Sequence, residues 1–109
     1  LHCLATYMRP RSNHKMGIML TDKLLYVVEF GRAVGELDQT IDELYKDILG
    51  RIELPTVESI QHFHRGATRL SDMGYYKDAL MFFERFPAIT DKQAIIACAI
   101  SNFEAGSPA

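Results

Sequence analysis

The sequence predicts an all-α protein of about five main helices, arranged as antiparallel pairs. Apolar residues recur at helical spacing from residue 21 to residue 103, whereas the strict alternation of a half-buried strand appears nowhere. Residues suited to begin and end helices lie between these apolar segments. Gly35, Gly74 and Gly106 each follow a segment, at the place where a glycine can make the turn of a helix hairpin.

The first twenty residues are set apart from the predicted helical domain, which spans residues 21–109. Residues 10–13, Pro-Arg-Ser-Asn, are expected to break any helix in this stretch. The stretch lacks the long apolar core and the small-residue cleavage site of a signal peptide. Three interpretations stay open: a short apolar arm, an upstream translated extension with Met16 as the natural start, or a remnant of expression.

Two amphipathic helices are predicted at residues 21–34 and 37–49. Thr21 is expected to cap the first helix by accepting a backbone N–H, and Asp22 favours its positive start. The second helix has the clearest amphipathic pattern in the chain, and Gly50 is expected to end it. Their apolar stripes are Leu24, Val27, Val28, Gly31 and Val34 in the first helix, and Leu37, Ile41, Leu44, Tyr45, Ile48 and Leu49 in the second.

Three more helices are predicted: one capped by Thr56, one over residues 75–86, and one opened by Thr90. Pro87 should end the second of these. Residues 94–100 are all apolar and compatible with a strand, but the cap, the alanines and the length to Phe103 favour a helix. The apolar stripe of the helix capped by Thr56 is Val57, Ile60, Phe63, Ala67 and Leu70. The inward residues of the helix over residues 75–86 are Tyr76, Ala79, Leu80, Phe83 and Phe86, and Tyr75 and Phe82 widen this face.

Superposing the chain on its turn glycines predicts an internal repeat. A large residue fills the space between two helices, while a small residue lets their backbones approach. In the first helices, residue size matches at the packing position, Leu24, Phe63 and Ile95, and at the close-contact position, Val28, Ala67 and Ala99. In the second helices, Leu37, Thr40 and Leu44 match Tyr76, Ala79 and Phe83 in size. The predicted repeat-packing residues are therefore Gly35, Phe63, Ala67, Gly74, Tyr76, Ala79, Phe83 and Ala99. Gly66 interrupts a helix at a cost of about 0.5–1 kcal/mol, so a close contact is expected there.

Residues 56–86, with Met73-Gly74-Tyr75-Tyr76-Lys77-Asp78-Ala79-Leu80, resemble a tetratricopeptide repeat, and residues 21–50 and 90–106 do so more weakly. A helical bundle with the same periodicity is the alternative. In the tetratricopeptide fold the first helix of each pair lines a groove, so the resemblance implies partner binding at Leu25, His64, Ile96, Ile100 and Phe103. Because Ile95, Cys98 and Ala99 are expected to serve the core, an amphipathic partner helix, the N-terminal arm or a second copy would cover the apolar groove.

A closer resemblance covers residues 60–106. The motifs that carry the resemblance are residues 73–80 and Ala97-Cys98-Ala99-Ile100-Ser101-Asn102-Phe103-Glu104-Ala105-Gly106. The chain is similar to the needle-subunit chaperones of type III secretion, of the YscG/PscG/EscG type, and its total length also fits this family. This resemblance implies a cytoplasmic, virulence-associated chaperone. Such a chaperone, with a small helical co-chaperone, holds the needle subunit and prevents its premature polymerisation. The alternative from another class is a helical interaction subunit that self-associates; copurification with a helical partner or a stable homodimer would distinguish the two.

Enzymatic, metal and cofactor chemistry are not expected. The net charge is −2 and the basic residues are scattered, which argues against a nucleic-acid surface. No apolar run approaches the roughly 20 residues of a membrane span. Cys3 and Cys98 lack a metal-like or redox spacing, which fits reduced thiols in the cytosol, and Cys98 is expected to be a small core residue. His62 and His64 should diverge on a helix, and no phosphate loop or nucleophile elbow appears.

Overall fold

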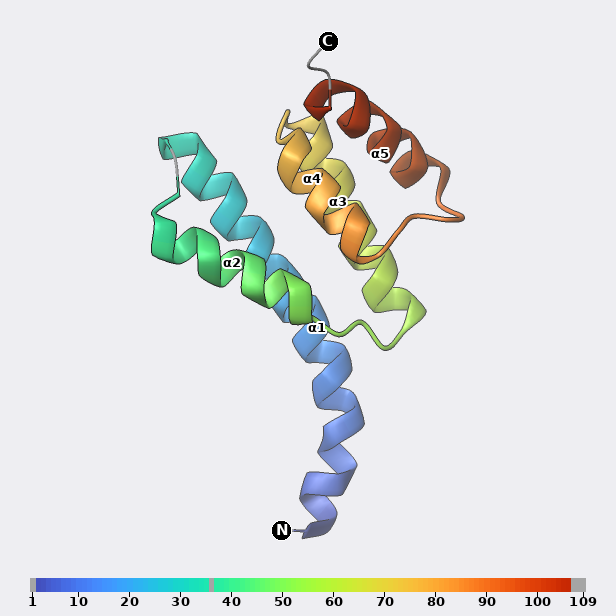
Figure 1. Cartoon of the computed structure of the whole chain (residues 1–109). Coiled ribbons are helices and arrows are strands. Elements are labelled where there is room, and N and C mark those ends of the chain that lie inside the picture. Colours follow the sequence, from blue (N-terminus) through green and yellow to red (C-terminus); the bar gives the residue numbers. More distant parts are fainter. Residues whose placement is uncertain (1, 36, 107–109) are drawn as a thin grey trace.

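The computed structural model describes residues 2–35 and 37–106, with side chains from residue 14 onward. This part forms five helices: α1 (His2–Val34), α2 (Gln39–Arg51), α3 (Val57–Asp72), α4 (Tyr76–Arg85) and α5 (Lys92–Ala105). Figure 1 shows that α1, α3 and α5 run in one direction, while α2 and α4 run in the other. The all-α fold is confirmed, with α1/α2 and α3/α4 as antiparallel pairs and α5 against the second pair.

The first helix is much longer than predicted. It passes through residues 10–13 without interruption, so the expected helix break is wrong. Proline keeps a helical φ and removes a single N–H donor, so a helix can continue through it at a cost of about 3 kcal/mol. Thr21 is not an N-cap: it is buried within α1, and its hydroxyl donates to the carbonyl of Gly17 at 2.8 Å. The boundary at residue 20 lies inside a helix, and the division of the chain there stays a prediction.

The second helix is displaced by two residues from its predicted position. Asp38 is its N-cap and accepts the backbone N–H of Thr40 at 2.9 Å. The predicted stop at Gly50 is wrong, because α2 continues to Arg51. Gly50 has open space around it, and a glycine inside a helix costs only about 0.5–1 kcal/mol. The helix ends instead where the buried Ile52 adopts an extended conformation.

The turn between α3 and α4 is made by Gly74, as predicted, with φ of +89°. The N–H of Gly74 donates to the carbonyl of Ser71 at 3.0 Å, and the N–H of Tyr75 donates to that of Leu70 at 2.9 Å. This pair of bonds is the Schellman motif, which needs a residue that tolerates a left-handed conformation. At the start of α3, Thr56 caps the helix as predicted, in a reciprocal box with Ser59.

The core lies between α3 and α4 and extends under α1 and α5. Phe63 of α3 stacks on Phe82 of α4, with 4.8 Å between the ring centroids. Ala67 and Ala79 are completely buried, as small residues must be where two helices approach closely. The buried apolar side chains are Leu24, Val28, Tyr45, Leu49, Ile52, Leu54, Phe63, Ala67, Leu70, Ala79, Phe82, Phe83, Ala94 and Ala97.

The fifth helix presents a different side to the core from the one predicted. Its N-cap is Asp91 rather than Thr90, and the Asp91 carboxylate accepts two backbone N–H groups. Ala94, Ala97 and Ser101 are buried, whereas Ile95 is 40% exposed and Ala99 is exposed. The periodicity of a helix that is apolar all round does not show which side faces the core, so packing against α3 and α4 decided it.

The predicted repeat is present in the first helices of the two pairs and absent elsewhere. The matched positions of α1 and α3 are all buried: Leu24, Val28, Phe63 and Ala67. In the second helices, Ala79 and Phe83 of α4 are buried, but Thr40 and Leu44 of α2 are exposed. Tyr76 is half-buried, and the exposed Ala99 is not a packing residue. The burial of a residue depends on the neighbouring helix as well as on the sequence pattern. Positions with matching residue sizes are therefore buried in one helix pair and exposed in the other.

Candidate functional site

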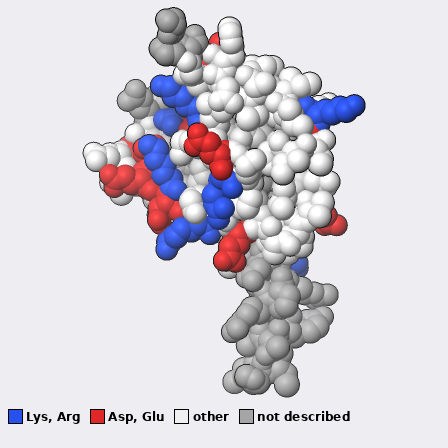
Figure 2. Space-filling view, turned by 45° about the vertical axis from the view of Figure 1, so that its right-hand side comes forward, with Lys and Arg blue, Asp and Glu red and all other residues white. Residues whose placement is uncertain are grey.

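The outer face of α5 is apolar and open to solvent. Ile96, Ile100 and Phe103 lie on it at helical spacing, with 58%, 46% and 74% of their surfaces exposed. The opposite side of the same helix is packed against α3 and α4. In Figure 2, where this side of the molecule comes forward, a broad area carries few charged side chains. We call these three residues, with the exposed Ile95, the α5 face.

A hollow of about 700 Å³ opens between the first half of α3 and the connection from α4 to α5. Its volume lies in the range of roughly 300–1,000 Å³ that is typical of ligand sites. Its walls combine apolar and polar side chains: Val57, Ile60, Gln61, His64, Arg65, Phe86, Pro87, Ile89, Thr90 and Asp91. Ile89 is 80% exposed and Val57 is 70% exposed, so apolar surface extends out of the hollow.

His64 lines this hollow and is 6% exposed. Its Nε2–H donates to the carbonyl of Phe86 at 2.6 Å, which ties α3 to the end of α4. In the neutral ring the other nitrogen, Nδ1, is then an acceptor. His62, two residues earlier, points to α1 instead and donates to Asp22 at 2.6 Å. The two histidine rings are therefore directed at different helices.

The structure brings together only some of the predicted groove residues. Ile96, Ile100 and Phe103 share the α5 face, and His64 lines the hollow. Leu25 is half-buried between α1 and α3, where its Cδ1 would lie 2.6 Å from a Cβ placed on Gly66. The close contact expected at Gly66 is therefore confirmed, and Leu25 is the residue that makes it.

A polar strip on α3 separates α1 from α5, so one apolar groove across all three helices is not formed. Gln61 and Arg65 are exposed on this strip. Arg69 lies beside them and pairs with Glu29 of α1, with 2.8 Å between Nε and Oε1. Tetratricopeptide-like spacing alone did not show this interruption, because the polar residues of α3 are also what any exposed helix face would carry.

Sequence reasoning missed a second exposed apolar surface, on α1. Tyr26 and Phe30 are 65% and 58% exposed, and their rings are stacked with 5.6 Å between centroids. Met16 and Met19 continue this surface toward the N-terminus. The spacing of these residues was available in the sequence. The predicted boundary at residue 20 divided them between an arm and a domain.

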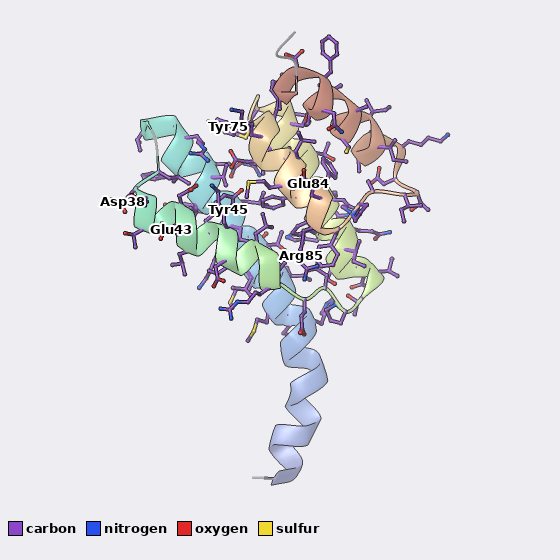
Figure 3. The ribbon with its side chains drawn as sticks, viewed as in Figure 1. Asp38, Glu43, Tyr45, Tyr75, Glu84 and Arg85 are labelled. Carbon is purple, nitrogen blue, oxygen red and sulfur yellow. The ribbon has the colours of Figure 1, made fainter. Side chains whose placement is uncertain are left out.

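A polar cluster around the buried Asp78 joins α1, α2 and α4. Arg32 donates from Nε and Nη2 to the two oxygens of Asp78 at 3.1 Å each, and the Tyr45 hydroxyl donates to Asp78 at 3.1 Å. The hydrogen bond to Asp78 raises the pKa of Arg32. Burial, with the nearby Asp78 charge, raises the pKa of Tyr45. Figure 3 shows Tyr45 pointing from α2 toward α4, so the cluster fastens α2 to the second pair.

Within residues 14–35 and 37–106, no three His, Cys, Asp or Glu side chains gather as a metal site would require. None of the helices in the described part is both long and apolar enough to cross a membrane. Comparison with protein-family models, with curated proteins and with solved structures gave no match. A function for this chain is therefore inferred from its own residues and surfaces.

Proposed function

We propose that this protein is a chaperone that holds an amphipathic helix of a small partner protein on the α5 face. The observation that carries the proposal is the exposure of Ile96, Ile100 and Phe103 on a helix whose other side already serves the core. Burying one such side chain fully contributes about 1.5–3 kcal/mol. Contiguous exposed apolar surface is typical of interaction sites.

The spacing of the α5 face suits a helical partner. A bound amphipathic helix presents apolar anchors every three or four residues, and Ile96, Ile100 and Phe103 have the same spacing. The hollow beside the start of α5 can take a further side chain, since Val57 and Ile89 extend its apolar wall. The role is binding rather than catalysis.

The resemblance of residues 60–106 to needle-subunit chaperones supports a specific partner: a small helical subunit of a type III secretion needle. Part of this resemblance is carried by residues 97–106, which comprise the second half of α5 and its C-cap, Gly106. Covering the apolar face of such a subunit would prevent its premature polymerisation. The cytoplasm as compartment, a small helical co-chaperone and a link to virulence belong to the same proposal.

Ile100→Asp tests the proposal, with Ile41→Asp as a matched control. Both isoleucines are 46% exposed, but Ile100 lies on α5 and Ile41 on α2. Ile100→Asp should weaken binding of a purified needle subunit at least about tenfold, because anchor residues each contribute more than about 1.4 kcal/mol. Ile41→Asp should leave the affinity unchanged. Isothermal titration calorimetry measures both, and circular dichroism should show unchanged helix content.

Unchanged binding by a folded Ile100→Asp variant would place the partner on another surface. Unfolding of that variant would show that Ile100 serves the core. The wild-type chain could instead bury Ile96 and Phe103 in a homodimer and bind no needle subunit. This result would favour the self-associating interaction subunit over the chaperone.

A further inference from the structure

The side of α1 that faces away from the core carries a regular seam of exposed residues. Four of its members are large and apolar, and they are between 46% and 65% exposed. The seam consists of Met16, Met19, Lys23, Tyr26, Phe30 and Ala33. Their steps alternate between three and four residues, as in a coiled-coil seam, whose repeat averages about 3.5 residues. We call these six residues the α1 seam.

The opposite side of α1 is already packed over residues 17–31. Leu24 and Val28 are buried on the opposite side. Leu25 meets Gly66 of α3 on one flank, and Gly31 lies against Leu37 on the other. A shallow apolar hollow of about 660 Å³ runs along the seam, lined by Lys15, Ile18, Met19, Asp22, Lys23, Tyr26 and Val27. The described residues of the chain leave this side open.

We propose that the α1 seam is the interface of a homodimer in which the α1 helices of two copies lie antiparallel across a two-fold axis. Such an interface is isologous, so the seam must be complementary to itself. The proposal concerns α1 alone and does not depend on the function proposed for the α5 face.

The seam meets this requirement when the axis passes between residues 24 and 25. Each seam position then faces another seam position of the partner copy, and each pairing occurs twice. Met19 of one copy then contacts the ring of Phe30 in the other copy, a favourable sulfur–aromatic contact. The ammonium of Lys23 contacts the ring of Tyr26 in the other copy, which is a cation–π contact. The facing pairs are Met16 with Ala33, Met19 with Phe30, and Lys23 with Tyr26.

Charge selects this orientation over the parallel one. In a parallel pair, Lys23 would face Lys23 of the other copy in the middle of the seam, and like charges there oppose pairing. In the antiparallel pair, Asp22 and Glu29 of opposite copies approach each other on one flank. Each of these acids already has a basic side chain of its own chain beside it. Asp22 is hydrogen-bonded to His62 at 2.6 Å, and Glu29 forms an ion pair with Arg69 at 2.8 Å. The flank therefore brings partnered carboxylates to the interface.

The length of the seam sets the expected strength. Seventeen helical steps of about 1.5 Å give a contact roughly 26 Å long. A single helix pair of this length lies at or below the small end of specific interfaces, roughly 1,200 Å². The dimer should therefore form at high concentration and dissociate on dilution.

Sedimentation equilibrium of the full chain over a dilution series tests the dimer, with two matched variants. Phe30 and Leu44 are 58% and 57% exposed, but only Phe30 belongs to the seam. Phe30→Asp should raise the dimer dissociation constant at least about tenfold, while Leu44→Asp should leave it unchanged. Both should keep the helix content of the wild type. A wild-type chain that stays monomeric throughout the series, or a dimer that survives Phe30→Asp, would overturn the proposal.

Disulfide trapping tests the register, in a chain with Cys3→Ser and Cys98→Ala. A mixture of Met19→Cys and Phe30→Cys chains should form a mixed disulfide, because facing seam positions bring two Cα atoms within the roughly 4.4–6.8 Å that a disulfide needs. Neither variant alone should cross-link. Self-cross-linking of Met19→Cys without the mixed product would show a parallel pair and contradict the proposed axis.

Discussion

The two helix pairs of this protein follow similar patterns of residue size, but they are packed to different depths. In α3/α4, Phe63 and Phe83 are both almost completely buried. In α1/α2, the matching Leu24 is buried, whereas the matching Leu44 is 57% exposed. Helix α1 also packs more extensively on α3 than on its own partner α2. A repeated pattern of residue sizes thus predicts helices with similar apolar faces. Which residues of those faces are buried depends on the other helices that pack against them.

The pairs also differ in what holds their second helix. An apolar layer with Phe82 and Phe83 fixes α4. Helix α2 buries only Tyr45 and Leu49, and polar bonds add to these contacts. The Tyr45 hydroxyl donates to Asp78 of α4, and Arg85 of α4 donates at 2.7 Å to the carbonyl of Ile52, the residue that follows α2 (Figure 3). Ile41 and Leu44 of the same helix stay exposed.

The largest expected difference between the pairs comes from truncating matched positions. Phe83→Ala should lower the free energy of unfolding by about 3–5 kcal/mol, because it leaves a cavity in the second pair. Leu44→Ala, at the matching position of the first pair, should change it by no more than about 0.5 kcal/mol. Urea denaturation followed by circular dichroism measures both. Equal losses would show that the first pair is packed as deeply as the second.

A smaller effect is expected at the bond that fastens α2 to α4. Tyr45→Phe should cost about 1.5–3 kcal/mol, since it removes a buried hydrogen bond to a carboxylate. Thr40→Ala, at an exposed position of the same helix, serves as control and should cost far less. A Tyr45→Phe variant as stable as the wild type would show that apolar contacts alone hold α2.

The same residue predicts a pH dependence. Burial raises the pKa of Tyr45 above its ordinary value of 10.0, so the folded phenol stays neutral when the unfolded one ionises. The unfolded state then binds fewer protons, and stability falls as pH rises above about 10, by at most about 1.4 kcal/mol per pH unit. Tyr45→Phe should lose this contribution, so its unfolding free energy should decline less between pH 9 and pH 11 than that of the wild type.

The smallest effect is expected at the turns. Gly74→Val should lower the unfolding free energy by more than about 1 kcal/mol, because a β-branched residue at positive φ is strained. Gly35 also has positive φ, but its N–H makes a long bond of 3.4 Å to Arg32, so the turn can relax. Gly35→Val should therefore cost less. The reverse order would mean that the first turn is the more rigid one.

The sequence by itself determined the features that depend on neighbours along the chain. The helices at residues 57–72 and 76–85 were predicted to within a residue or two, because Thr56, Gly74 and Pro87 act on backbone groups only a few residues away. The sequence also indicated that Ile96, Ile100 and Phe103 lie outside the core, since a helix that is apolar all round cannot place every side in one core. Their coverage by a partner helix, a second copy or the N-terminal arm stays a prediction.

The tertiary structure decided what depends on residues far away in the chain. It turned Ala94 and Ser101 rather than Ile95 toward the core, and it left Leu44 exposed. It also opened the α1 seam and separated it from the α5 face by the polar strip on α3. Hydrophobic burial is non-directional and rewards whichever surfaces meet, so a local pattern shows that a helix has an apolar face but not which neighbour covers it.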